Sequence, residues 1–129
     1  MNNFTIKTFK KISIVFFICI INGYAFSNEF EIEAERVNYD NVEGQIIAEG
    51  NASATNEDGK IITANKIIYF KENGIIKTIG NSKFSDEEKV LTANEFSYNV
   101  NTKIINAVGN VVFTDEDKNK FFFEKFTYN

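Results

Sequence analysis

The sequence predicts an all-β fold, in which tandem two-strand repeats of about 30 residues form a twisted, jelly-roll-like open β-sandwich. Three features recur at the same interval and in the same order along the chain. The first is a tyrosine, at Tyr39, Tyr69, Tyr98 and Tyr128. The second is a Gly-Asn pair, at 50–51, 80–81 and 109–110. The third is an acidic turn, at 56–60, 85–89 and 114–118. Three independent features in one register indicate a true internal repeat.

The first strand of each unit ends at the repeated tyrosine. These strands are expected at 32–39, 62–69, 91–98 and 121–128. Apolar residues alternate at Leu91 and Ala93, then resume out of phase at Phe96 and Tyr98. One extra residue shifts the two-residue period by half a cycle, as a β-bulge or bend does. Because the shift recurs in all four copies, the first strands are predicted to carry a device for curvature.

The second strand of each unit alternates more regularly around a central glycine. One face is formed by Ile105, Ala107, Gly109, Val111 and Phe113, matched by Ile76, Thr78, Gly80, Ser82 and Phe84, and by Ile46, Ala48, Gly50, Ala52 and Ala54. Glycine weakens a strand unless it serves a bulge, a corner or the close approach of another chain segment. One of these three roles is therefore expected at each Gly-Asn pair.

Short polar turns separate the strands, at 40–41, 72–74 and 99–101. No sustained helical periodicity occurs, and the chain contains no proline. A unit of two short strands cannot bury its own apolar face, so the copies must stack or pair. About seven strands in tandem favour a folded-over sheet, either a jelly-roll-like sandwich or an open twisted groove.

Residues 1–27 have the organisation of a signal peptide. A basic segment precedes a short apolar run, at Lys7, Lys10 and Lys11 and at 12–21. Small residues at Ala25 and Ser27 predict cleavage after Ser27, with cleavage after Ala25 as the second choice. A retained membrane anchor is the alternative. The apolar run is short for a span, which needs about 20 residues.

The remaining segment, 28–129, is long enough for one domain. It keeps all 18 acidic residues and loses three of the 14 basic ones, so it is acidic. An acidic surface repels phosphate backbones, which argues against nucleic-acid binding. The one cysteine, Cys19, lies in the apolar run behind Phe17 and Ile18, which argues against lipidation. The processed chain therefore depends on packing and strand pairing, without disulfides.

The repeated pattern resembles the OstA-like domain of the lipopolysaccharide-transport system, found in LptA and in the N-terminal periplasmic part of LptD. The resemblance spans 28–129 and consists of Ala-x-x-(Val/Ile/Phe)-x-Tyr, a short turn, and Ile-x-(Ala/Thr)-x-Gly-Asn. Its copies are 34–39 with 47–51, 64–69 with 80–81, and 93–98 with 105–110. The chain lacks the large barrel and the paired cysteines usual in LptD proteins. An LptA-type protein, a truncated LptD N-terminus and a stand-alone relative all remain open.

The resemblance implies a V-shaped β-jelly roll whose apolar interior shields the acyl chains of lipid A. The implied function is that of a periplasmic carrier or bridge in lipopolysaccharide transport and outer membrane assembly. The implied partners are lipopolysaccharide and neighbouring bridge domains that join by edge-strand pairing, with possible self-association. The periplasm is the expected location, beside the outer membrane if the chain is an LptD N-terminal region. An inner-membrane-anchored relative in the same system is a further alternative.

The regular face of the second strands, with two aromatic residues of the first strands, is the predicted lipid-binding trough. Its members are Ile46, Ala48, Ile76, Phe84, Phe96, Ile105, Val111, Phe113 and Phe126. In a fold of this kind the trough and the hydrophobic core share one interior, so the same residues also suit simple core packing. The tyrosines are expected to pack at strand ends.

No catalytic residues, metal ligands or cofactors are predicted. The chain has no histidine, and its one cysteine lies in the signal segment, so histidine triads, thiol nucleophiles and thiolate or imidazole metal sites are excluded. Carboxylates cluster only in the acidic turns, which are expected to be solvated hairpin tips. The alternative is that these turns bind Ca²⁺ in a structural or adhesive repeat protein.

Overall fold

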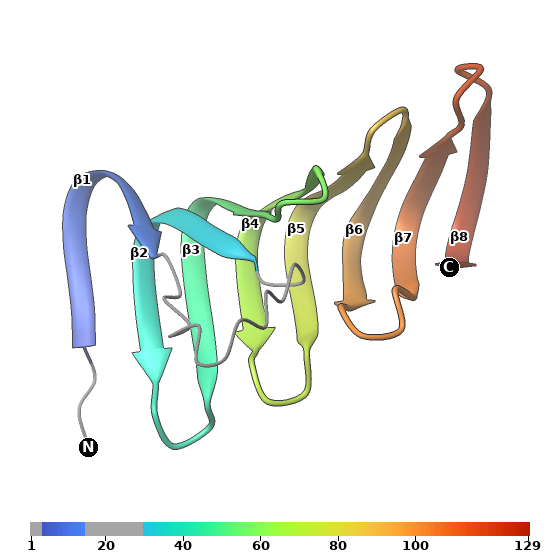
Figure 1. Ribbon diagram of the computed structural model, residues 1–129. Coiled ribbons are helices and arrows are strands. Elements are labelled where there is room, and N and C mark those ends of the chain that lie inside the picture. The colour runs from blue at the N-terminus through green and yellow to red at the C-terminus, as the bar shows by residue number, and fades with distance from the viewer. Residues whose placement is uncertain (1–3, 15–29) are drawn as a thin grey trace.

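A computed structural model describes residues 4–14 and 30–129 of the chain. The fold is all-β, with antiparallel strands in one open sheet whose spatial order follows the chain from β1 to β8 (Figure 1). The strands are β1 (Phe4–Ile14), β2 (Glu31–Asp40), β3 (Gln45–Thr55), β4 (Lys60–Phe70), β5 (Ile75–Asp86), β6 (Lys89–Asn99), β7 (Ile105–Thr114) and β8 (Lys120–Tyr128). The described residues include no helix with the length and hydropathy that crossing a membrane requires.

Strand β1 lies inside the segment predicted to be a signal peptide. It pairs antiparallel with β2, and therefore occupies the edge of β2 that β3 leaves open. The predicted cleavage site at 25–27 and Cys19 lie outside the described residues. The seven strands β2–β8 form the part of the sheet that corresponds to the predicted domain.

The connections between strands are short turns. Side chains within these turns accept hydrogen bonds from backbone amides that have no backbone partner. Asp40 Oδ1 accepts hydrogen bonds from the amides of Val42 and Glu43, at 2.9 and 3.2 Å. Asn99 Oδ1 accepts from Asn101 and from the residue after it, at 2.9 and 3.0 Å. Such contacts are the reason why Asp and Asn favour turns. The predicted turns after the repeated tyrosines are confirmed.

Every pair of neighbouring strands shows a shift of register near its middle. Between β4 and β5, the pairing skips 64–65 on β4 but 80–82 on β5. The extra residue therefore lies in the second strand of the unit, which carries the Gly-Asn pair. The prediction that placed it in the first strand of each unit was wrong. Gly80 and Asn81 both have positive φ, +79° and +47°, and the pair forms the bulge. A glycine that serves a bulge was one of the predicted roles.

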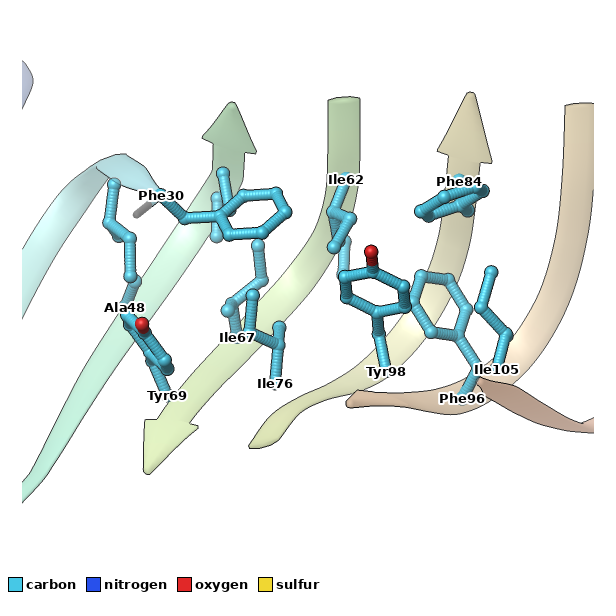
Figure 2. Close-up of a cluster of buried hydrophobic side chains, with 14 of the residues drawn as sticks. Phe30, Ala48, Ile62, Ile67, Tyr69, Ile76, Phe84, Phe96, Tyr98 and Ile105 are labelled. Atoms are coloured by element: carbon cyan, nitrogen blue, oxygen red, sulfur yellow. The ribbon is translucent and has the colours of Figure 1, made fainter. Parts of the chain in front are cut away.

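The strands bend at these bulges, and the sheet folds over on itself. Phe84 and Tyr98 lie toward opposite ends of the β5–β6 pair, opposite Leu91 and Ile76 respectively. Their ring centroids are nevertheless only 5.4 Å apart (Figure 2). Phe30, just before β2, meets Tyr98 edge-to-face at 5.9 Å, although β3, β4 and β5 separate their strands. The concave face of the sheet therefore encloses an interior.

This interior is the hydrophobic core. Its largest fully buried aliphatic side chains are Ile32, Ile46, Ile62, Ile67, Ile76, Ile105, Val37 and Val111. Alanines fill the positions beside the bulges, such as Ala64 and Ala93. Small side chains there let the two halves of each strand approach closely after the bend.

Two polar side chains are buried among these residues. Thr78 and Ser82, on either side of the β5 bulge, are joined by a hydrogen bond of 2.6 Å between their hydroxyl oxygens. Thr78 Oγ1 also accepts from the amide of Phe96 at 3.0 Å, and Ser82 Oγ donates to the carbonyl of Asn94 at 3.1 Å. Buried hydroxyls need such partners, so this pair links the β5 bulge to β6.

Candidate functional site

The residues predicted to line a lipid trough all lie in the interior. Seven are buried: Ile46, Ala48, Ile76, Phe84, Phe96, Ile105 and Val111. The other two, Phe113 and Phe126, are only partly buried and pack against the edge of the core. The predicted face is therefore one continuous apolar surface, closed over most of its length and partly open at β7 and β8.

The open end carries a cluster of aromatic rings, which we call the aromatic end. Phe113 on β7 lies 5.3 Å from both Phe126 and Tyr128 on β8, measured between ring centroids. Phe123 stacks on Phe126 at 4.8 Å, and Phe121 lies 6.4 Å from Phe113. These five rings form the last part of the concave face before the sheet ends.

Exposure rises sharply at this end. The side chains of Phe121 and Phe123 are 45% and 40% exposed. The residues in the same repeat positions of β6, Leu91 and Ala93, are 2% and 7% exposed. Strand β7 covers the latter residues, but nothing in the described chain covers β8 on its far side. The aromatic end is thus an exposed apolar surface of unusual composition.

Three members of this end were not predicted from the sequence: Phe121, Phe123 and Tyr128. A local signal was present, because three consecutive phenylalanines at 121–123 replace the Leu-Thr-Ala of the preceding copy. Phe123 stands where the other first strands have alanine, at Ala34, Ala64 and Ala93. A large ring at a position that holds alanine in the other three copies was a signal that the closed interior ends there.

A pocket opens at the aromatic end, with about 240 Å³ of free space that includes open solvent. It is lined by Phe84, Asp86, Lys89, Val90, Leu91, Ile105, Phe113 and Tyr128. Because this volume includes solvent outside the pocket, the enclosed space is small, and a bulky ligand requires movement of β7 and β8 away from the core.

A lysine lies at the rim of this pocket. Lys89 Nζ donates a hydrogen bond of 3.0 Å to the hydroxyl oxygen of Tyr128 and lies 3.7 Å from a carboxylate oxygen of Glu116. The hydrogen bond to Tyr128 is the main cause that raises the pKa of Lys89, and the carboxylates of Glu116 and Asp86 add to it. The rim therefore carries a cation whose charge is balanced by neighbouring acids.

Tyr98 is the largest fully buried side chain, and its hydroxyl oxygen has no hydrogen-bond partner among the described residues. Burial, with smaller contributions from the carboxylates of Asp86 and Asp58, raises its pKa to about 12. A buried phenol without a partner is held in its neutral form, because ionisation would place a charge in an apolar interior.

This shift predicts loss of stability at alkaline pH. The phenol has a pKa near 10.0 when unfolded and about 12 when folded. Below pH 10 both states hold the proton. Between pH 10 and 12 the folded state binds more protons, so the free energy of unfolding should fall by about 1.4 kcal/mol per pH unit. Guanidinium unfolding from pH 9 to 11 measures this slope.

Tyr98→Phe is the control for that measurement, since it removes the titrating group and keeps the ring. All other titrating groups are common to the two proteins, so the difference between their slopes isolates Tyr98. An equal alkaline slope in both proteins would show that burial of this phenol does not control the effect.

The acidic turns are exposed, as predicted for hairpin tips. The carboxylate of Asp115 is used within its own turn, where it accepts hydrogen bonds from Asp117 N at 2.9 Å and from Asn119 N and Nδ2 at 2.9 and 3.1 Å. The contacts with Asn119 lower the pKa of Asp115. No group of three potential metal ligands occurs within 30–129 or 4–14. These observations do not favour the calcium-binding alternative.

Comparison with known proteins identifies no relatives for this chain: no protein-family model matches it, and no curated protein does. The resemblance to the OstA-like domain is carried by the repeated residues alone. What the structure adds is an all-β open sheet with a folded apolar face and an aromatic end.

Proposed function

We propose that this protein is a periplasmic lipopolysaccharide carrier that shields lipid A acyl chains in the apolar interior of its folded sheet. In this proposal the sheet is a repeat-built, V-shaped jelly roll. The carrier acts while lipopolysaccharide is transported to the outer membrane and while that membrane is assembled. The observation that carries the proposal is the aromatic end, where the otherwise closed apolar interior meets solvent through Phe113 and Phe126.

The continuity of the interior supports this function. Buried apolar side chains extend from Phe30, beside β2, to Val111 on β7. Each CH₂ group of an acyl chain that leaves water gains about 0.8 kcal/mol. An acyl chain that enters between the two halves of the sheet would replace contacts among core side chains with contacts between these side chains and lipid. The net cost in free energy would be small. Within residues 30–129 the buried polar residues are Thr78 and Ser82, and neither carries a charge.

The aromatic end supports entry at β7 and β8. Exposed rings on a soluble protein are stabilised by any apolar partner that removes them from water. Phe113 packs against Phe121, and Phe123 stacks on Phe126, so exposed and partly buried rings adjoin one another here. Acyl chains would bind there first, and deeper binding would require the halves to part toward β6. In this proposal, movement of lipid along the protein draws on an energy source elsewhere in the transport system.

The proposal predicts which side chains touch lipid, and site-specific photocrosslinking in cells that make lipopolysaccharide tests it. A photoreactive phenylalanine analogue at Phe113 or Phe126, on the concave face, should give a lipopolysaccharide adduct. The matched control is the same analogue at Phe122, which is 73% exposed and follows Phe121 on the opposite face of β8. A second control is Glu116, in an exposed turn.

Adducts at Phe113 and Phe126 that exceed those at Phe122 by about tenfold or more would establish the concave face as the lipid site. Equal adducts at Phe113 and Phe122 would indicate nonspecific adsorption to exposed rings. The absence of adducts at Phe113 and Phe126, in protein shown to be folded and exported, would exclude the carrier function.

A further inference from the structure

Tyr98 brings a hydroxyl group into the apolar interior, where it has no hydrogen-bond partner among the described residues. The side chain is 1% exposed, so bulk solvent does not reach this hydroxyl. Asn38 Oδ1 is also buried without such a partner, but Asn38 follows the inward Val37 on β2 and therefore faces away from the interior. Most buried polar atoms in folded proteins have a partner, and each exception calls for an explanation. Within residues 30–129, Tyr98 is the exception that faces the interior.

Hydroxyl groups nearby in the sheet do have partners. Thr78 and Ser82 bond to each other at 2.6 Å, and each also bonds to the backbone of β6. At the repeat position that Tyr98 occupies on β6, the Tyr128 hydroxyl of β8 accepts a hydrogen bond from Lys89. Tyr39, at the same position on β2, is exposed. The fold therefore provides partners for hydroxyls elsewhere and leaves that of Tyr98 available to a molecule that enters the interior.

Tyr98 lies directly behind the pocket at the aromatic end. Two residues that line this pocket, Phe84 and Ile105, are also neighbours of Tyr98. The ring centroid of Phe84 is 5.4 Å from that of Tyr98, and Ile105 lies directly opposite Tyr98 in the β6–β7 pair. The Tyr98 hydroxyl points into the interior, on the side where Ile62 and Phe84 lie (Figure 2). A chain that enters the pocket and displaces the Phe84 ring therefore reaches Tyr98 next.

The surroundings of Tyr98 restrict the chemical group that can bind its hydroxyl. Burial, with smaller contributions from Asp86 and Asp58, raises the pKa of Tyr98 to about 12, so the phenol keeps its proton at neutral pH. The same two carboxylates disfavour an anionic group beside the phenol. A neutral hydroxyl can accept the hydrogen bond of the phenol, and it can also donate to the phenol oxygen. The group that fits best is therefore a neutral hydroxyl on an otherwise apolar chain.

We propose that Tyr98 determines specificity in the interior: it hydrogen-bonds a hydroxyl group carried by a bound acyl chain, and so favours hydroxylated over unsubstituted chains. This inference rests on the proposed function, because an acyl chain must enter the interior to reach Tyr98. Sites for apolar ligands bury most of the ligand against hydrophobic side chains, and a small number of polar groups fix its orientation. Tyr98 is such a polar group. It also fixes how far the chain enters, because the ligand hydroxyl must come to rest beside the phenol.

A ligand hydroxyl gains more at Tyr98 than at a protein group that already has a partner. In the described chain the phenol is buried and unpaired, so a hydrogen bond to the ligand displaces no bond between the phenol and other protein groups. The ligand hydroxyl loses its own contacts with water when it enters, which offsets part of the gain. A net preference of about tenfold for the hydroxylated chain is therefore expected.

Binding of dodecanoate and of its monohydroxylated forms to the purified chain tests the proposal. The forms carry the hydroxyl near the carboxylate, at mid-chain or near the methyl end, and each places it at a different depth. Affinities are measured by displacement of a fluorescent fatty acid, below the concentration at which these lipids form micelles. We expect at least one hydroxylated form to bind about tenfold tighter than dodecanoate. Tyr98→Phe should bind dodecanoate within about threefold of the original chain and should lose the preference.

Tyr39→Phe is the matched control, because it removes the same atom at the same repeat position, where the ring is 37% exposed. It should keep the full preference, and circular dichroism checks that both variants fold. Equal binding of all forms to the original chain, or a preference that survives Tyr98→Phe, would overturn the role of Tyr98 and leave lipid carriage intact. Absence of binding by dodecanoate and by every hydroxylated form would overturn both proposals. Lipid adducts at Phe113 report on carriage alone, so the two failures are distinguishable.

Discussion

Replacement of Tyr98 by alanine is expected to lower the free energy of unfolding by about 3–5 kcal/mol, as for other large buried aromatic residues. The ring is 1% exposed and contacts Phe30 at 5.9 Å and Phe84 at 5.4 Å. Because these partners come from distant parts of the sheet, the substitution removes contacts that hold its folded halves together. Chemical denaturation of the original chain and the variant measures the loss.

Tyr98→Phe separates the ring from the hydroxyl. The hydroxyl oxygen is buried without a partner in the described part of the chain, and an unsatisfied buried polar group costs about 1–3 kcal/mol. The phenylalanine variant should therefore be as stable as the original chain at neutral pH, or more stable by about 1 kcal/mol. A loss similar to that of alanine would mean that the hydroxyl, rather than the ring, holds the two halves together.

The inward positions of the strands could be predicted from the sequence because they depend on local alternation. Ile46, Ile76 and Ile105 occupy one phase of a two-residue period, and all three are buried. Alternation records which face of a strand meets the core, and the position in the repeat aligns one copy with the next. The turns at 40–41 and 99–101 were predicted from their Asp and Asn residues, whose side chains hydrogen-bond to the turn backbone.

The bulge was predicted in the wrong strand because a period shows a change of phase but not the pairing. Opposite the bulge, the inward residues of β4 are three apart, Ala64 and Ile67, and across the bulge those of β5 are four apart, Thr78 and Ser82. Only the comparison across the pair shows that the extra residue belongs to β5. A glycine and an asparagine with positive φ were the local signal, since both residues tolerate that conformation better than others do.

Contacts between the two folded halves of the sheet could not be predicted from the sequence. Nothing local links Phe30 to Tyr98, because their meeting depends on the angle through which three intervening strands bend. Equivalent tyrosines also differ in exposure: Tyr69 is buried, whereas Tyr39 is exposed. The aromatic end was missed for a related reason. Exposure of Phe121 depends on which strand lies beside β8, and not on its own repeat position.

The Gly80-Asn81 bulge of β5 should be sensitive to a side chain at its glycine. Gly80→Val is expected to lower the free energy of unfolding by about 3–4 kcal/mol, through backbone strain and overlap with a neighbour. Strain arises because φ is +79°, a conformation that a β-branched residue avoids. Overlap arises because the new Cβ would lie 2.6 Å from Asn65 Nδ2, whose side chain is held by the hydrogen bond to Asn81.

Gly59→Val is the matched control, because φ is +84° there and no atom lies within 4 Å of a new Cβ. It reports strain alone and should cost about 1–3 kcal/mol. A second variant, Asn65→Gly in the Gly80→Val background, removes the overlapping side chain and should recover about 1 kcal/mol or more. If Gly80→Val and Gly59→Val cost the same, Gly80 is required only for its backbone conformation. The Asn65 side chain that lies over Gly80 would then contribute nothing to the requirement for glycine at this bulge.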